Sequence, residues 1–215
     1  EGTTKPSKVN AFHLSFDSVT DEMKTILGQG DILLDCLPVK LAPKMAQLAK
    51  DYHLHYANLT EYVAETEEII NLAKDASTGF VLQTGLAPGY LDLLDTAIFK
   101  QFSHEYKVNK ADKLEFKVGA LTNHAVGPHY YGFTWSPVGV ATEYLKDAVV
   151  LRDFNIATLP ALSERATIII DGIAYEEDLT SGGAADLPAA FSGKVCSLDY
   201  KTLRHPGHYA WVEKQ

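Results

Sequence analysis

The chain lacks the compact motifs that identify several large enzyme classes. Its 215 residues contain no Gly-x-Gly-x-x-Gly loop, no Walker-type phosphate loop and no Gly-x-Ser-x-Gly elbow. These absences exclude three kinds of site from the chain: a self-contained dinucleotide fingerprint, a P-loop nucleotide site and the serine nucleophile of the α/β-hydrolases. Covalent catalysis by serine or cysteine therefore has no positive support.

Cysteine is scarce. The two cysteines, Cys36 and Cys196, are far apart and have no zinc-like spacing. They form no disulfide framework, which is typical of a reducing compartment. Because Cys36 lies within the apolar run 31–37, we expect it to be a buried small hydrophobe.

Clustered positive charge and long apolar runs are also missing. The formal net charge is −9 and the lysines and arginines are scattered, which argues against a nucleic-acid partner. No apolar stretch is long enough to span a membrane. Residues 1–6 contain no apolar signal core. We therefore expect a cytoplasmic protein without a membrane partner.

The first hundred residues alternate between strand-like and helix-like patterns. This alternation predicts a parallel sheet with right-handed crossovers. The runs 31–37 and 80–83 are continuously apolar, which favours helices on both faces of the sheet. The expected strands are 9–16, 31–37, 55–59 and 80–83, and the expected helices follow them at about 18–30, 39–52, 66–76 and after residue 89.

The pattern changes near residue 103. The second region predicts an α+β domain with a mostly antiparallel or mixed sheet, with strands at 113–118, 130–135, 167–175 and 195–203 and a helix at 138–150. The organisation is thus two domains, residues 1–102 and 103–215. The mixed sheet of the second domain suits an isologous dimer.

The most informative stretch is residues 84–92, Thr-Gly-Leu-Ala-Pro-Gly-Tyr-Leu-Asp. A strand precedes it and a helical pattern follows it. Such a turn lies at the carboxyl ends of parallel strands, where open α/β sheets bind their ligands. Gly85 and Gly89 permit a close backbone approach or a positive φ, and Pro88 stiffens the turn.

Further candidates for chemistry lie in the second region. Arg204 ends a long strand just before a Pro-Gly break, where it could clamp a carboxylate bidentately. His205 and His208 are possible acid/base groups. Trp135 could form the wall of a pocket or belong to the core. The loop 123–129 carries two histidines but no third ligand at metal-binding spacing, so no metal is expected.

In order and spacing, these segments resemble the saccharopine dehydrogenase family, including its lysine 6-dehydrogenase-like members. The resemblance covers nearly the whole chain and rests on residues 31–38, Tyr62, 85–89, 133–137, 143–144 and 201–208. It implies a partial Rossmann-type dinucleotide domain followed by a substrate-binding and dimerisation domain. It also implies NAD or NADP as the cofactor and reversible oxidation of an amino-acid C–N bond, whose imine product is hydrolysed.

The chain departs from the family pattern in three ways. The Gly-rich phosphate loop is expected before residue 1, and members usually continue beyond residues 206–208, so we expect a fragment. Ala87 stands where saccharopine-specific members tend to have Asp, and 118–120 reads Val-Gly-Ala instead of Cys-Gly-Gly. These departures favour a lysine 6-dehydrogenase-like or unassigned substrate over saccharopine.

Carried onto this chain, the resemblance assigns Pro38, Gly85, Leu86, Pro88 and Gly89 to the cofactor, and Tyr62, Trp135 and Arg204 to the substrate. It leaves the catalytic acid/base group open, with His205, His208 and Glu143 as candidates. Two alternatives remain, a non-catalytic dimerisation or regulatory module and a homospermidine synthase-like enzyme. Arg204 favours a carboxylate-bearing substrate over a polyamine.

Overall fold

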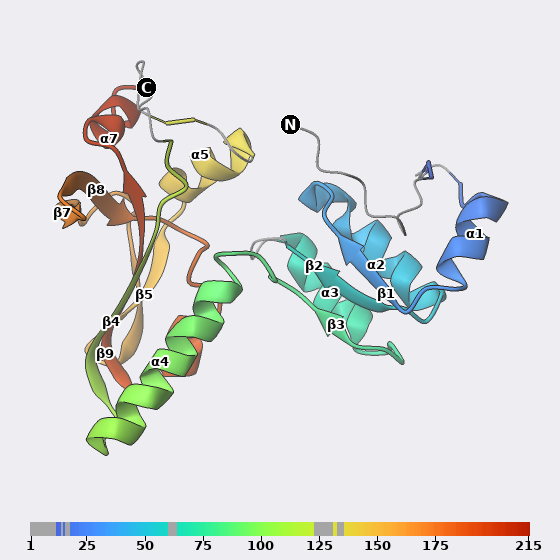
Figure 1. The fold of residues 1–215 in the computed structure, drawn as a ribbon, viewed down its shortest axis with the longest axis horizontal. Helices are drawn as coiled ribbons and strands as arrows, with labels where there is room; N and C mark the ends of the chain where they lie inside the picture. Colours follow the sequence, from blue (N-terminus) through green and yellow to red (C-terminus); the bar gives the residue numbers. More distant parts are fainter. Residues whose placement is uncertain (1–11, 14, 16–17, 60–63, 123–130, 133–135) are drawn as a thin grey trace.

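The structure is a computed structural model of the chain. It describes residues 12–13, 15, 18–59, 64–122, 131–132 and 136–215. Two lobes are visible, each built around one sheet (Figure 1). The expected strand at 9–16 falls mostly outside the described residues, and so does most of the one at 130–135.

The first lobe is a parallel three-stranded sheet, as the alternating pattern predicts, and its strand order is β1-β2-β3. Its strands are β1 (Ile32–Asp35), β2 (His55–Asn58) and β3 (Phe80–Val81). Its helices are α1 (Asp21–Leu27), the 3-10 turn η1 (Val39–Leu41), α2 (Ala42–Asp51) and α3 (Ala64–Ala73). All three strands therefore end at the same edge.

The expectation that helices cover both faces is wrong for the described residues. Leu33 and Tyr56 point into one core with α1, α2 and α3. On the other face Ile32 and Leu34 are 67% and 61% exposed. Successive side chains of a strand point to opposite faces, so an apolar run does not show how many faces are covered.

Cys36 is exposed, which contradicts the expectation that it is buried. It follows Asp35, the last residue of β1, and thus lies beyond the part of the run that packs against the helices.

A buried hydrogen-bond network joins the strand ends of this lobe. The Tyr56 hydroxyl donates to Asp35 Oδ2 over 2.8 Å, and Asn58 Nδ2 donates to the Tyr56 hydroxyl over 3.4 Å. The Asn58 side chain in turn accepts from the backbone N–H of Gln83 over 3.1 Å. The network fixes the edge at which the turn after β3 begins.

The second lobe is a six-stranded mixed sheet, which confirms the predicted fold class. β4 runs parallel to β9, whereas the β5–β6, β5–β9, β7–β8 and β8–β9 pairs are antiparallel. Its elements are α4 (Tyr90–Tyr106), β4 (Ala111–Val118), α5 (Pro137–Leu145), β5 (Ala148–Arg152), β6 (Asn155–Leu159), β7 (Ala166–Ile170), β8 (Ile173–Leu179), α6 (Leu187–Phe191), β9 (Val195–Arg204) and α7 (His208–Val212).

The predicted helix at 138–150 is too long. α5 ends at Leu145, Lys146 is already extended, and Ala148–Arg152 forms β5 instead. The apolar stripe continues into Val149 and Val150, whose β-branched side chains suit a strand paired with β6. β6 itself was not predicted.

The two faces of the second sheet differ in chemistry. α4 and α6 cover an apolar face that includes Phe116, Leu198 and Tyr200, and α4 lies along β4 and β9 in Figure 1. On the opposite face eight charged side chains form a continuous series of ion pairs: Lys113–Glu115–Lys117–Glu177–Lys201–Glu164–Arg152–Asp199. The predicted boundary at residue 102 falls inside α4.

Candidate functional site

The carboxyl edge of the small sheet carries two of the predicted segments. Pro38 follows β1 and is exposed, and residues 85–89 follow β3. Thr84 is fixed to β2, because its backbone N–H and its hydroxyl both donate to the carbonyl of Asn58, over 2.8 and 2.7 Å. The structure therefore brings Pro38 and the turn to the same edge.

The turn closes on itself and begins α4. Tyr90 N–H donates to the Gly85 carbonyl over 2.8 Å, and Gly89 has a φ of +131°. The Ala87–Pro88 peptide bond is cis. Pro88 is buried and Leu86 is 58% exposed, while Ala87 packs against the apolar core of the second lobe. The turn thus contacts both lobes.

Two buried carboxylates lie in the first turns of α4. Asp92 Oδ2 accepts the Gly89 N–H over 2.6 Å, and Asp95 is 5% exposed. Burial raises the pKa of Asp92 to about 6. Burial, helped by the charge of Asp92, raises the pKa of Asp95 to about 6. One oxygen of each carboxylate, Asp92 Oδ1 and Asp95 Oδ2, has no hydrogen-bond partner among the residues that the structure describes.

Asp95→Asn should stabilise the chain at neutral pH. The folded pKa lies above the ordinary value of 3.8, so the folded state binds more protons than the unfolded state between these values. The ionised carboxylate therefore destabilises the fold above about pH 6, and this cost disappears as the pH falls toward about 4. We expect thermal unfolding to show a higher Tm for Asp95→Asn at pH 7.5 and nearly equal values at pH 4. A lower Tm at pH 7.5 would contradict this interpretation.

Arg204 is at the centre of the second cluster. It ends β9 and is 2% exposed. Its Nε–H donates to the Tyr144 hydroxyl over 2.7 Å and its Nη1 donates to the Leu203 carbonyl over 2.8 Å. The guanidinium carbon lies 4.4 Å from the centre of the Tyr131 ring. Among the described residues, no carboxylate forms a salt bridge with it.

Tyr144 connects this arginine to a histidine. Its hydroxyl lies 2.9 Å from Nε2 of His208, which is 2% exposed. Arg204 Nε–H can only donate, so the Tyr144 oxygen accepts there and its own proton is available to His208. Burial raises the pKa of Tyr144 to about 12, although Arg204 acts to lower it. The hydroxyl is therefore protonated at neutral pH.

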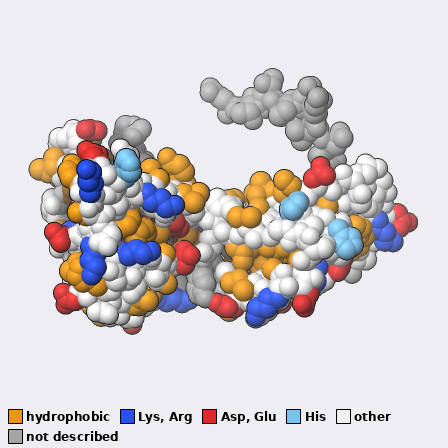
Figure 2. Space-filling view, turned by 90° about the horizontal axis from the view of Figure 1, so that it is seen from below, with side chains coloured by type: hydrophobic (Ala, Val, Ile, Leu, Met, Phe, Trp, Pro, Cys, Tyr) orange, Lys and Arg blue, Asp and Glu red, His pale blue; other side chains and the backbone are white. Residues whose placement is uncertain are grey.

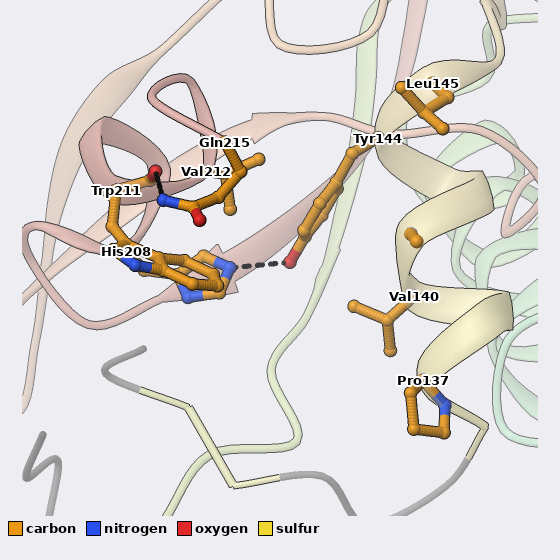
Figure 3. Close-up of a pocket in the computed structure, with 9 residues that line it drawn as sticks. Pro137, Val140, Tyr144, Leu145, His208, Trp211, Val212 and Gln215 are labelled. Carbon is orange, nitrogen blue, oxygen red and sulfur yellow. Dashed lines mark hydrogen bonds between the residues drawn. The ribbon is translucent and has the colours of Figure 1, made fainter. Parts of the chain in front are cut away.

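A pocket of about 300 Å³ opens beside this pair (Figure 3). It lies between α5 and α7, and Tyr144 and His208 are among the polar residues that line it. Apart from Gln215, its other lining residues are Pro137, Val140, Ala141, Leu145, Trp211 and Val212. The pocket suits a ligand with a largely apolar body and one polar group.

Some of the site residues predicted from the sequence lie in the described part of the chain, and others lie outside it. Tyr62, Trp135 and the histidine loop 123–129 lie outside the described residues. His205 Nε2 lies 2.9 Å from the Thr122 carbonyl, and Glu143 is 9% exposed. Arg204 has no hydrogen bond to residues 85–89. The roles assigned from the sequence stay predictions.

Sequence reasoning gave no role to Tyr144 or Tyr131. Tyr144 follows Glu143 in one of the segments that carry the resemblance, but its contact with Arg204 spans 60 residues. In the described ranges, no group of His, Cys, Asp and Glu side chains is arranged to hold a metal ion, and no helix is long and apolar enough to span a membrane.

Comparison with known proteins gives distant relatives. No protein-family model matches the chain. It is 22% identical to the mitochondrial alpha-aminoadipic semialdehyde synthase of Rattus norvegicus over 161 residues, and 21% identical to that of Mus musculus. These matches cover 73% of the chain but only 17% of either relative.

A solved structure matches over a longer part of the chain. Apo saccharopine dehydrogenase (L-Glu forming) from Saccharomyces cerevisiae superposes with a TM-score of 0.68 at 20% identity. The match covers 89% of this chain and 44% of the yeast chain. The resemblance predicted from the sequence is therefore confirmed, and the chain has the fold of the corresponding part of that dehydrogenase.

Proposed function

We propose that this chain, which shares its fold with saccharopine dehydrogenase, forms part of an NAD(P)-dependent oxidoreductase. The reaction would be oxidation of a C–N bond in an amino acid of the saccharopine or lysine type. The observation that carries the proposal is Arg204, a buried cation that no carboxylate neutralises among the described residues. A buried unpaired charge is costly, and a substrate carboxylate would supply the missing counter-charge.

An unpartnered hydrogen-bond donor at the carboxyl edge of the small sheet supports binding of the nicotinamide half of the cofactor there. Gln83 lies two residues beyond β3, and its buried Nε2 has no hydrogen-bond partner in the described part of the chain. A carboxamide oxygen is the kind of acceptor that this donor lacks. Pro38, residues 85–89 and Gln83 would hold this half, and the phosphate-binding loop would come from outside the 215 residues. A bound nicotinamide would supply the hydride acceptor.

In this proposal, Arg204, Tyr144 and His208 orient the substrate and hold a proton. Arg204 holds the Tyr144 hydroxyl by its Nε–H, and that hydroxyl lies within hydrogen-bond distance of His208. With Nε2 accepting from the Tyr144 hydroxyl, His208 can take up the hydroxyl proton as the Tyr144 oxygen receives one from the substrate amine. We therefore assign His208 as the candidate base and Tyr144 as the group that passes the proton to it.

Turnover of the full-length gene product tests the function. Nicotinamide reduction should be followed at steady state with lysine and with saccharopine, each against NAD and NADP. Turnover with lysine alone would place the protein with the lysine 6-dehydrogenase-like enzymes. Turnover with saccharopine would mean that Ala87 and residues 118–120 are compatible with that substrate. No turnover with either would favour the non-catalytic module.

Tyr144→Phe should lower kcat/KM by about 10-fold to 100-fold, because Arg204 and His208 lose the group that joins them. The pH profile of kcat should shift, since a residue that orients a base also alters its proton affinity. Tyr106→Phe is the matched control, because Tyr106 is 61% exposed at the end of α4. Equal effects of the two variants on activity would contradict the assignment.

A further inference from the structure

The short helix α7 carries His208 to the pocket but cannot fix its position alone. It has five residues, His208–Val212, and a helix of this length is not stable without tertiary contacts. The pocket of about 300 Å³ lies between α7 and α5, so the packing of α7 against α5 is incomplete (Figure 3). The position of His208 therefore depends on contacts of α7 with other elements.

Arg165 supplies such a contact. It immediately precedes β7, and its Nη2 donates to Oε1 of Glu213, the residue that caps the C-terminus of α7. The Glu213 N–H in turn donates to the Tyr209 carbonyl over 3.0 Å, so Glu213 is fixed to the helix. The guanidinium carbon of Arg165 also lies 5.2 Å from the centre of the Tyr209 ring. Arg165 thus contacts α7 at two points, one of them adjacent in sequence to His208.

Arg165 is itself fixed to the mixed sheet. Its Nε–H donates over 3.1 Å to Oδ2 of Asp178, a residue of β8 that is 0% exposed. The other oxygen of this carboxylate, Oδ1, accepts the backbone N–H groups of Glu164 and Leu179 over 3.0 and 2.9 Å. A charge-assisted hydrogen bond to a carboxylate held in this way orients the guanidinium. Arg165 is therefore a fixed link between the sheet and α7.

We propose that the ion pair of Arg165 with Glu213 positions α7 so that His208 reaches the Tyr144 hydroxyl. This role rests on the proposed function, in which His208 takes up the proton that Tyr144 passes to it. The contact between the two is 2.9 Å, so a shift of α7 by about 1 Å would lengthen it beyond hydrogen-bond range. Arg165 and Glu213 are positioning residues, because they act on the proton transfer through α7.

The test needs a matched ion pair, because acidic and basic side chains are mixed on the face of this lobe that Figure 2 shows. Arg152 exposes 29% of its side chain, as Arg165 does, and donates to both carboxylate oxygens of Glu164 over 2.9 Å. The hydrogen bonds of the Arg152 side chain to described residues all lie outside α7. Removing the Glu164 side chain is therefore the matched control for removing that of Glu213.

Nuclear magnetic resonance of the 215-residue chain measures the position of His208 without turnover. The nitrogen resonance of Nε2 depends on whether that atom accepts a hydrogen bond. We expect it to move in Glu213→Ala, to stay near the parent value in Glu213→Gln, which keeps an acceptor for Arg165, and to be unchanged in Glu164→Ala. The Tm of Glu213→Ala should stay within about 4 °C of the parent, because exposed ion pairs contribute little to stability.

Steady-state kinetics of the full-length protein give a second readout. Glu213→Ala should lower kcat by about 10-fold, shift its pH profile and change KM little, because a displaced base affects the reacting step more than binding. Equal effects of Glu213→Ala and Glu164→Ala on the His208 resonance, or no effect of either, would overturn the proposal. If the resonance moves as expected but no amino acid is turned over, the proposed function fails and the positioning of His208 stands.

Discussion

Gly89→Ala should destabilise the chain by at least about 3 kcal/mol, because strained backbone and steric overlap add at this position. Gly89 has a φ of +131°, which side chains other than glycine rarely adopt. A Cβ placed there would overlap the Gly85 carbonyl oxygen and lie 2.5 Å from that of Gln83. Both are backbone atoms: the Gly85 carbonyl accepts the Tyr90 N–H, and Gln83 is held to Asn58 through its own N–H, so neither moves cheaply.

The control for this variant is Gly132→Ala. Apart from its chain neighbours, no heavy atom of the described residues lies within 4 Å of the position that its Cβ would occupy. Its free energy of unfolding should change by less than about 1 kcal/mol. Denaturant unfolding measures both variants, and equal midpoints would mean that the turn is not the strained, closely packed element described here. Loss of stability in Gly89→Ala should be accompanied by weaker nucleotide binding in the full-length protein, because the turn forms part of the proposed cofactor edge.

Lys201→Met should destabilise the chain by about 3 kcal/mol, because breaking a buried ion pair leaves an uncompensated charge. The Lys201 side chain is 9% exposed and lies 3.5 Å from Glu177 Oε1. It also donates to the Glu164 carbonyl over 3.2 Å. Glu177 keeps a second contact of 3.3 Å to Lys117, which limits the loss of stability in this variant.

Lys113→Met is the matched control, since it removes the same group from the exposed end of the same series of ion pairs. The Lys113 side chain is 57% exposed and lies 2.7 Å from Glu115. Exposed pairs contribute about 1 kcal/mol or less. The double variant Lys201→Met with Glu177→Gln should recover part of the loss, because it also removes the stranded charge. If Lys201→Met lowered the free energy of unfolding by no more than Lys113→Met does, the result would contradict the proposed role of burial.

The sequence predicts local features of this protein better than tertiary contacts. The parallel direction of β1 to β3 follows from the alternation of strands and helices, and the turn at 85–89 follows from its glycines and proline. The exposure of Ile32 and Leu34 does not follow, because an apolar strand has the same pattern whether one or two faces are covered.

The same limit applies to the second cluster. The sequence draws attention to Arg204 through its place before a Pro-Gly break, and α7 follows as a short helix. Its contact with Tyr144 depends on β9 and α5 lying side by side, and no pattern within either segment encodes that distance. The end of α5 at Leu145 is likewise decided by the pairing of β5 with β6.

Ligand protection in the full-length gene product tests whether the turn after β3 and the Arg204 cluster belong to one dinucleotide-dependent site. Hydrogen exchange should be compared for the free protein, with reduced nicotinamide nucleotide, and with lysine or saccharopine added. We expect the nucleotide to protect residues 83–91 and the amino acid to protect the backbone around Tyr144 and Arg204. Protection confined to other segments, or none at saturating ligand, would contradict the account.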